Sequence, residues 1–160
     1  MKTLIILLTL VTVTASAQVK CKYEKNEVDE FTGKVRRELT MSTIGSVSGK
    51  KLEGLVGQSD SSFYTLFYTT ADLGCGTSKS ITYLMFTDGE VLPLSYQGKI
   101  SCGTIVFMHK FTNEELEKVR TKRIDKIRYK LTLEGEVKVT NTDFFIQSFS
   151  CLENTTISKR

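Results

Sequence analysis

The sequence predicts an α+β domain, mostly antiparallel β, with seven or eight strands arranged in hairpins and two short helices at about 112–121 and 142–152. Three observations predict this class. Apolar and polar residues alternate with period two over many short runs, two pairs of runs flank turn residues, and a capping motif opens a helical pattern. Since no repeat or Pro-rich linker divides the chain, we expect residues 18–160 to form a single disulfide-stabilised domain.

The first 17 residues have the pattern of a secretory signal peptide. Lys2 supplies the positive start, Leu4–Val13 is an apolar run, and Ala15–Ala17 is an A-x-A cleavage site. We expect cleavage after Ala17 and an exported product, either periplasmic or secreted. The apolar run is shorter than the ~20 residues that span a bilayer, so we expect no membrane-spanning segment.

The segment Asn26–Glu38, NEVDEFTGKVRRE, concentrates acidic residues before a glycine. Thr32 stands where an EF-hand calcium loop starting in this segment would need glycine. A five-residue hairpin tip, Asp29–Gly33, fits better, because its last residue can take the positive φ that a tight tip requires. This loop would set Tyr23 against Leu39.

Three further runs are predicted strands. Residues 34–49 are expected to form one longer strand with polar interruptions. Residues 61–70 have apolar side chains at both odd and even positions, which is typical of a central strand buried on both faces. Residues 99–110 complete the set.

Residues 80–96, SITYLMFTDGEVLPLSY, have the clearest hairpin pattern. Asp88-Gly89 is a favoured pair for a two-residue loop, which would set Ile81 against Tyr96, so that paired positions sum to 177. Both strands are largely apolar on both faces, so we expect this hairpin well inside the sheet. Pro93 is the exception, because it lacks an N–H and belongs at an edge or a bulge.

All four cysteines lie beyond the expected cleavage site, which favours disulfides in an oxidising compartment. No C-x2-C motif occurs and the chain has one histidine, so we expect neither a metal site nor a cofactor. The positions of Cys75 and Cys102 also sum to 177, which predicts a disulfide between them if the hairpin pairing continues outward. Cys21 and Cys151 would then join the two ends of the chain.

Two segments have helical spacing. Thr112 and Glu115 form a capping box that opens the helix over 112–121. The segment 142–152 is predicted as an amphipathic helix that presses its aromatic side chains on the sheet and brings the last cysteine toward the first. The predicted inner faces of these helices carry Leu116, Val119, Phe145, Ser148, Phe149 and Leu152.

Residues 126–140, KIRYKLTLEGEVKVT, form the second predicted hairpin. Apolar side chains occupy odd positions on both sides of a glycine, while basic side chains occupy even positions. Matching odd positions to odd positions needs a loop of odd length, so Glu134–Glu136 is the predicted turn. We expect the basic residues to face solvent.

Residues suited to catalysis are sparse. His109 is the only histidine, and we expect it on the surface at the end of a strand, so nothing supports Ser–His–Asp chemistry. The acidic residues lie in predicted turns or on an exposed helix, where each has a structural role, so we predict no glycosidase pair. The chain is therefore not expected to be an enzyme.

A run of basic residues is the best candidate for a binding surface. It comprises Lys122, Arg123, Lys126, Arg128 and Lys130. An anionic surface or an acidic polysaccharide would suit it, and the alternative is a solvated face balanced by nearby glutamates. The formal net charge of the whole chain is only +4, so we do not expect nucleic acid as a partner.

Four motifs are shared with a known group. They are the signal ending SAQ, the segment YEKNEVDEFTGK, DKIRYKL after TNEELEKV, and CL in the last short helix. In these motifs the chain resembles a group of small, uncharacterised exported proteins of Bacteroidota-type bacteria. The resemblance covers most of the chain, implies an exported α+β domain and supplies no catalytic residue.

These observations leave three functional hypotheses. The first is an exported non-catalytic domain that acts through binding. The second is a carrier of a small hydrophobic ligand in a barrel-like fold of about eight strands, and the third is a hydrolase whose carboxylates converge only in the folded protein. An apolar cavity large enough for a ligand would favour the carrier. Two carboxylates that converge in a cleft would favour the hydrolase. A filled core with neither feature would favour the binding domain.

Overall fold

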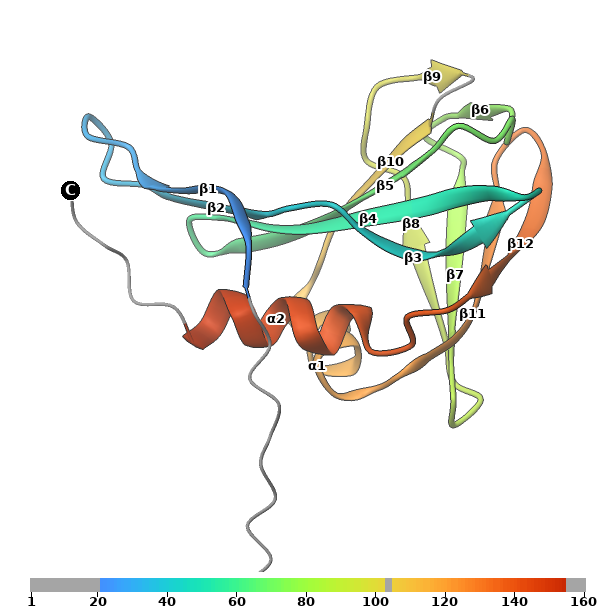
Figure 1. Cartoon of the computed structure of the whole chain (residues 1–160). Coiled ribbons are helices and arrows are strands. Elements are labelled where there is room, and N and C mark those ends of the chain that lie inside the picture. The colour runs from blue at the N-terminus through green and yellow to red at the C-terminus, as the bar shows by residue number, and fades with distance from the viewer. Residues whose placement is uncertain (1–20, 103–104, 155–160) are drawn as a thin grey trace, which may run out of the picture.

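The computed structural model describes residues 21–102 and 105–154, and within them it has twelve strands and two helices (Figure 1). The strands are β1 (Tyr23–Val28), β2 (Val35–Leu39), β3 (Ser42–Val47), β4 (Lys50–Ser59), β5 (Ser62–Thr69), β6 (Cys75–Gly76), β7 (Ile81–Phe86), β8 (Val91–Ser95), β9 (Ser101–Cys102), β10 (Ile105–Lys110), β11 (Ile124–Lys130) and β12 (Glu134–Val139). The helices are α1 (Asn113–Thr121) and α2 (Phe144–Asn154).

The α+β class, mostly antiparallel β, is confirmed, although the described strands outnumber the seven or eight expected. The expected signal peptide, 1–17, lies outside the described residues. Neither of the two described helices has the length and the apolar composition that a membrane crossing requires.

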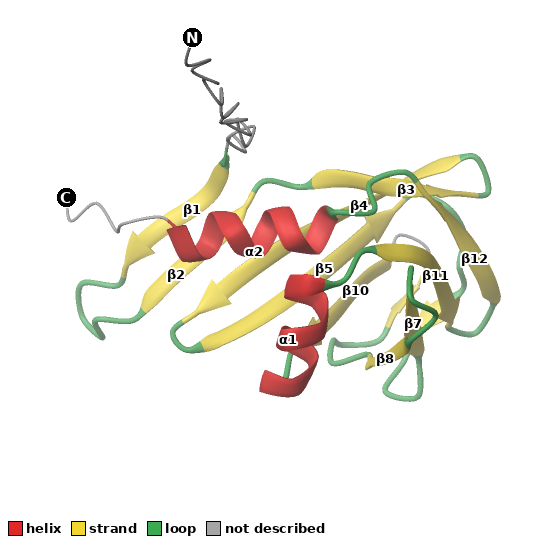
Figure 2. Cartoon of the chain, turned by 90° about the horizontal axis from the view of Figure 1, so that it is seen from below, coloured by secondary structure: helices red, strands yellow, loops and turns green. Residues whose placement is uncertain are grey.

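Ten of the described strands form one sheet that rolls on itself (Figure 2). The order is β1-β2-β4-β3-β12-β11-β7-β8, while β5 pairs with the other edge of β4 and β10 pairs with β5. The roll nearly closes where the chain leaves β8. There Gln97 N donates to Met108 O on β10 at 2.8 Å, and Lys110 N donates to Gln97 Oε1 at 3.1 Å.

Strand β4 pairs with two strands in succession along one edge. Its first half pairs with β3 and its second half with β2, and paired positions sum to 97 and then 96 along β3 but to 95 along β2. The single strand expected over 34–49 is therefore wrong. Thr40 and Met41 interrupt it, so β2 and β3 lie end to end along β4, and the β1–β2 hairpin continues past the roll as an arm (Figure 1).

Helix α2 lies along the concave side of the sheet, beneath β2 and β4 (Figure 1). Phe144, Phe145 and Phe149 are almost completely buried, and their rings contact one another and the phenylalanines of β5 and of the β10–α1 connection. A Cβ atom at Gly54 of β4 would clash with Phe144 and Ile44, so glycine is what permits this close approach. The inner face predicted for this helix is confirmed.

Three interactions attach the C-terminal end of α2 to the arm. Cys151 forms the expected disulfide with Cys21. Tyr23 Oη donates to the carbonyl of Cys151 at 2.7 Å, and Arg37 Nη1 donates to the carbonyl of Leu152 at 2.6 Å. The last carbonyls of a helix lack partners within it and carry partial negative charge, so the hydroxyl and the buried guanidinium stabilise this end. The arm is thereby held in one direction relative to the body.

The β7–β8 hairpin corrects the predicted register. Tyr83 pairs with Pro93 and Leu84 with Leu92, so paired positions sum to 176 and the loop has three residues rather than two. Gly89, at φ +86°, closes this loop in the left-handed conformation typical of three-residue hairpins. The strands are buried on one face only, and β8 is at the end of the main strand path, which explains why Pro93 is tolerated there.

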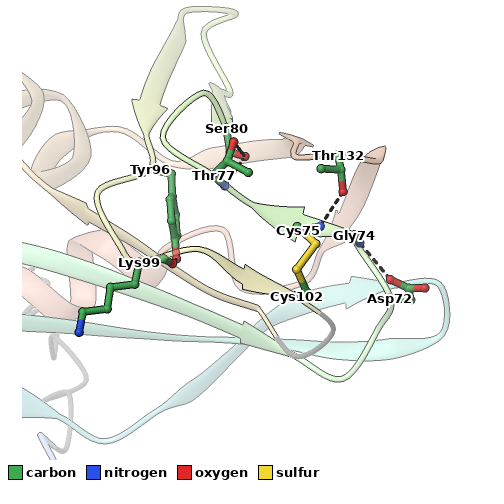
Figure 3. The surroundings of a disulfide bond; sticks show 9 residues. All are labelled: Asp72, Gly74, Cys75, Thr77, Ser80, Tyr96, Lys99, Cys102 and Thr132. Carbon is green, nitrogen blue, oxygen red and sulfur yellow. Dashed lines mark hydrogen bonds between the residues drawn. A yellow bond between two sulfur atoms is a disulfide. The ribbon is translucent and has the colours of Figure 1, made fainter.

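The Cys75–Cys102 disulfide forms as predicted, but not through a continuous ladder (Figure 3). The two cysteines pair in a separate two-stranded sheet, β6–β9, whose register sum is 177 while that of the hairpin is 176. A turn between Thr77 and Ser80 separates the two ladders. The predicted disulfide is confirmed, but the predicted continuation of the hairpin pairing to the cysteines is wrong.

In the other two hairpins the side chains face the predicted sides, but the loops lie at different residues from those predicted. Tyr23 pairs with Leu39 as predicted, yet a bulge after Tyr23 lengthens the tip to six residues, 29–34. In the β11–β12 hairpin the turn is Leu131–Leu133 instead of Glu134–Glu136. Parity is preserved, so the apolar side chains of β11 still face inward and the basic ones outward.

The two disulfides are expected to differ in their effect on stability. The Cys21–Cys151 bond closes 130 residues and the Cys75–Cys102 bond closes 27. In the chain-entropy model these loops are worth about 5 and about 3.6 kcal/mol respectively. Replacing both cysteines of each pair by alanine and measuring urea denaturation should therefore show the larger loss for Cys21/Cys151. A larger loss for the Cys75/Cys102 variant would contradict this ranking.

Candidate functional site

A groove of about 410 Å³ lies on the outer face of β7, β8, β11 and β12. Its lining combines three apolar residues with five charged ones: Tyr83, Met85, Val91, Lys126, Arg128, Lys130, Glu134 and Glu136. The groove exists because β11 turns its even-numbered residues outward. These are the positions that the alternation of the sequence assigned to solvent.

The pairing of β11 with β7 places cations beside apolar side chains. Lys126 lies opposite Met85, and Arg128 lies opposite Tyr83. Arg128 is 3.6 Å from Glu136, and Lys130 is 3.3 Å from Glu134 of the adjoining strand. Lys126 makes no ion pair with any residue that the structure describes, so its ammonium group is available to a ligand.

The predicted basic surface is divided between different places. Lys126, Arg128 and Lys130 line the groove, whereas Lys122 and Arg123 lie at the end of α1 and contribute nothing to it. Arg123 pairs with Asp143 at 2.8 Å, before the start of α2. Sequence alternation found the three cations, but it missed the apolar floor, because no local pattern predicts that β11 pairs with β7.

Lys122 joins the β7–β8 turn to α1. Its ammonium group contacts Asp88 at 2.6 Å and also contacts Glu90. Hydrogen bonds to these two carboxylates raise the pKa of Lys122, and the same bonds lower the pKa of Asp88 and of Glu90. Lys118 adds a contact of 3.1 Å to Glu90. The charges are compensated within the protein, which gives this cluster a structural role.

His109 was expected on the surface, and the structure contradicts this: only 3% of the residue is exposed. Its Nδ1 is 2.9 Å from the carbonyl of Ser95, and its Nε2 is 3.1 Å from Glu115 Oε2. The predicted capping box is present, since Thr112 N donates to the same Glu115 oxygen at 2.7 Å. The histidine is buried because α1 folds back over the end of β10 and brings Glu115 onto it.

The contacts of His109 are structural. A carbonyl and a carboxylate are both hydrogen-bond acceptors, so each ring nitrogen of His109 faces an acceptor held by the fold. Burial raises the pKa of Glu115, but hydrogen bonds from Thr112 N and His109 outweigh it and the net shift is downward. No hydroxyl group is hydrogen-bonded to this histidine within the part of the chain that the structure describes. Through these contacts Ser95, His109 and Glu115 connect β8, β10 and α1.

The tip of the β1–β2 arm is a turn built around Asp29. Its carboxylate accepts from Phe31 N at 3.1 Å, Thr32 N at 2.7 Å and Thr32 Oγ1 at 2.8 Å, and the bonds from Thr32 lower the pKa of Asp29. Gly33 takes the positive φ predicted for it, +68°. Among the described residues there is no group of three or more His, Cys, Asp or Glu side chains placed to hold a metal ion.

The interior of the roll contains little free space. A cavity of about 20 Å³ lies among apolar side chains that include Phe67, Phe107 and Tyr129. That is about the room of a single water molecule. A second outer hollow, about 330 Å³, lies beside the Cys21–Cys151 disulfide between α2 and the sheet.

Comparison with protein-family models, with curated proteins and with solved structures finds no match to this chain.

Replacing Glu115 should destabilise the protein in a graded way. Glu115→Ala removes the acceptor of both Thr112 N and His109, and we expect it to lower the free energy of unfolding by about 2 kcal/mol. Glu115→Gln keeps one acceptor oxygen and should lose less than half of that. Urea denaturation at pH 7 measures both, and equal losses would contradict the role assigned to the carboxyl oxygen.

The stabilising effect of the Glu115 charge should depend on pH. Because the folded-state pKa lies below the ordinary value of 4.5, ionised Glu115 contributes stability above that value and loses it as the pH falls through the folded pKa. The stability difference between the native protein and Glu115→Gln should therefore be largest near neutral pH and shrink below about pH 4. A difference that stays constant from pH 7 to pH 3 would be inconsistent with this linkage.

Proposed function

We propose that this protein is an exported, non-catalytic binding domain whose groove takes a compact acidic ligand that also carries an apolar group. The observation that carries the proposal is the pairing of β11 with β7, which sets the unpaired Lys126 beside Met85 and Arg128 beside Tyr83. A volume of about 410 Å³ lies within the ~300–1,000 Å³ typical of ligand sites.

The distribution of charge favours a compact ligand over an extended polyanion. Of the five predicted basic residues, four make ion pairs with carboxylates of the same chain: Lys122, Arg123, Arg128 and Lys130. An acidic polysaccharide or an anionic surface would have to compete with each of these pairs. A ligand with one or two carboxylates can pair with Lys126 without breaking an existing ion pair, and it can also bury an apolar group in the groove.

Two features support an exported binding role. Both disulfides join cysteines beyond the A-x-A motif, and disulfides persist in oxidising compartments such as the periplasm or the extracellular medium. The pair of buried His109 and half-buried Glu115 is hydrogen-bonded to backbone groups of the fold rather than presented to a substrate. These contacts support a non-catalytic role.

The size of the interior cavity favours the groove over the core as the binding place. A carrier of a hydrophobic ligand needs several hundred Å³ of enclosed space, whereas the hollow among the inner side chains around Phe67, Phe107 and Tyr129 holds about 20 Å³. Helix α2 occupies the concave side with its phenylalanines. A ligand held inside would have to displace them.

Titration with 3-phenylpropionate, a small aromatic carboxylate, tests this proposal. We expect changes in the ¹H–¹⁵N spectrum confined to the groove, and Lys126→Glu should weaken binding about tenfold, which corresponds to about 1.4 kcal/mol. Lys51→Glu is a matched control, since Lys51 is an exposed residue of β4 and β3 separates that strand from β12. Spectral changes outside the groove, or equal binding by both variants, would contradict the proposed site.

A further inference from the structure

The tip of the β1–β2 arm presents a phenylalanine entirely to solvent. Phe31 is 99% exposed, more than any other large apolar residue among those described. The Asp29 carboxylate holds the backbone of Phe31 and Thr32, so the ring is presented from an ordered turn. An exposed aromatic side chain in an ordered position is typical of an interface anchor.

The tip and the groove have complementary composition. Around Phe31 the tip, residues 29–34, carries two carboxylates, Asp29 and Glu30, and one ammonium, Lys34, which gives a net charge of −1. Glu30 forms no ion pair with other described residues. The groove offers three cations against two carboxylates, a net charge of +1, over an apolar floor. Each side thus has one apolar feature bordered by charge of opposite sign to the other.

The tip and the groove lie at opposite ends of the molecule. Both views show the β1–β2 turn at one end and the strands β7, β8, β11 and β12 at the other (Figures 1 and 2). The tip therefore cannot reach the groove of its own chain. Contact between two different patches on identical molecules is heterologous, and without closure it repeats into an open chain.

We propose that the ligand of the groove is the arm tip of a second copy of this protein. Phe31 of one molecule inserts over Tyr83 and Met85 of the next, and the carboxylates of the tip meet Lys126 and Arg128. The copies join head to tail. This inference rests on the proposed function of the groove, and it names the partner of that site.

Sedimentation velocity of the processed chain, recovered after export, tests the inference. Between 10 µM and 1 mM the native protein should form species larger than a dimer, and 0.5 M salt should reduce them. Phe31→Ser should weaken association tenfold or more. Ile100→Ser is the matched control, because Ile100 is 75% exposed and lies outside both the tip and the groove. It should associate like the native protein.

A mixing experiment distinguishes head-to-tail contact from other association. Phe31→Ser keeps an intact groove, and Lys126→Glu/Arg128→Glu keeps an intact tip, so each variant alone should be monomeric. Mixed together they should form a one-to-one complex and nothing larger, since that complex has no functional tip and groove left to pair. Absence of the complex, or growth of the mixture beyond it, would overturn the inference.

Three other outcomes would also reject it. If the native protein is monomeric at 1 mM while its groove binds 3-phenylpropionate, self-association is wrong and the proposed function stands. If Phe31→Ser associates as strongly as the native protein, the tip is not the anchor. If a monomeric native protein binds phosphatidylcholine or phosphatidylglycerol vesicles through Phe31, the tip serves a lipid surface instead.

Discussion

The packing of α2 inside the rolled sheet is the interaction on which the rest of the structure depends. Phe144, Phe145 and Phe149 fill the concave side that the sheet would otherwise expose, and Gly54 lets the helix approach the backbone of β4. Burial of large aromatic side chains is the strongest apolar contribution available to a chain without tryptophan. Without this helix the sheet would have no partner for its inner face.

The position of α2 also determines the direction of the arm. Because the end of the helix is bonded to Cys21, Tyr23 and Arg37, the β1–β2 hairpin is attached at its base on both strands. Its far end is free of the body and carries the exposed phenylalanine. A disulfide between the two ends of the domain thus does more than limit the unfolded chain: it fixes the element that we infer to make contact with another molecule.

A filled interior leaves the outer faces and the sheet edges for function. The roll has one-sided strands at β7, β8 and β11, and their outward residues form the groove. The charge around the groove is largely neutralised locally, as in the cluster around Lys122 and in the pairs of Arg128 and Lys130. Exposed ion pairs of this kind contribute little stability, so their arrangement matters more for what the surface can bind. Lys126 differs from its neighbours because no carboxylate of the described chain compensates it.

Local patterns in the sequence were sufficient for the elements that depend on neighbouring residues. The Thr112–Glu115 capping box, the positive φ of Gly33, the inner face of α2 and the outward cations of β11 follow from spacing alone. The pairing of the cysteines was predicted correctly from the sum of 177, although the continuous ladder that this sum assumed is interrupted by the turn at Thr77–Ser80. The register of the β7–β8 hairpin was harder to predict from the sequence, because its loop has three residues rather than two and depends on the left-handed conformation of Gly89.

The site required the tertiary structure. His109 is buried because a helix after it in the chain folds back, and no pattern around the histidine predicts that contact. Lys126 lies beside Met85 because β11 pairs with β7. The tip of the arm lies away from the body because β2 and β3 pair with different halves of β4. Alternation and capping act over a few residues and are encoded locally. The groove and the arm result from pairing and packing between residues far apart in the chain, which only the complete fold brings together.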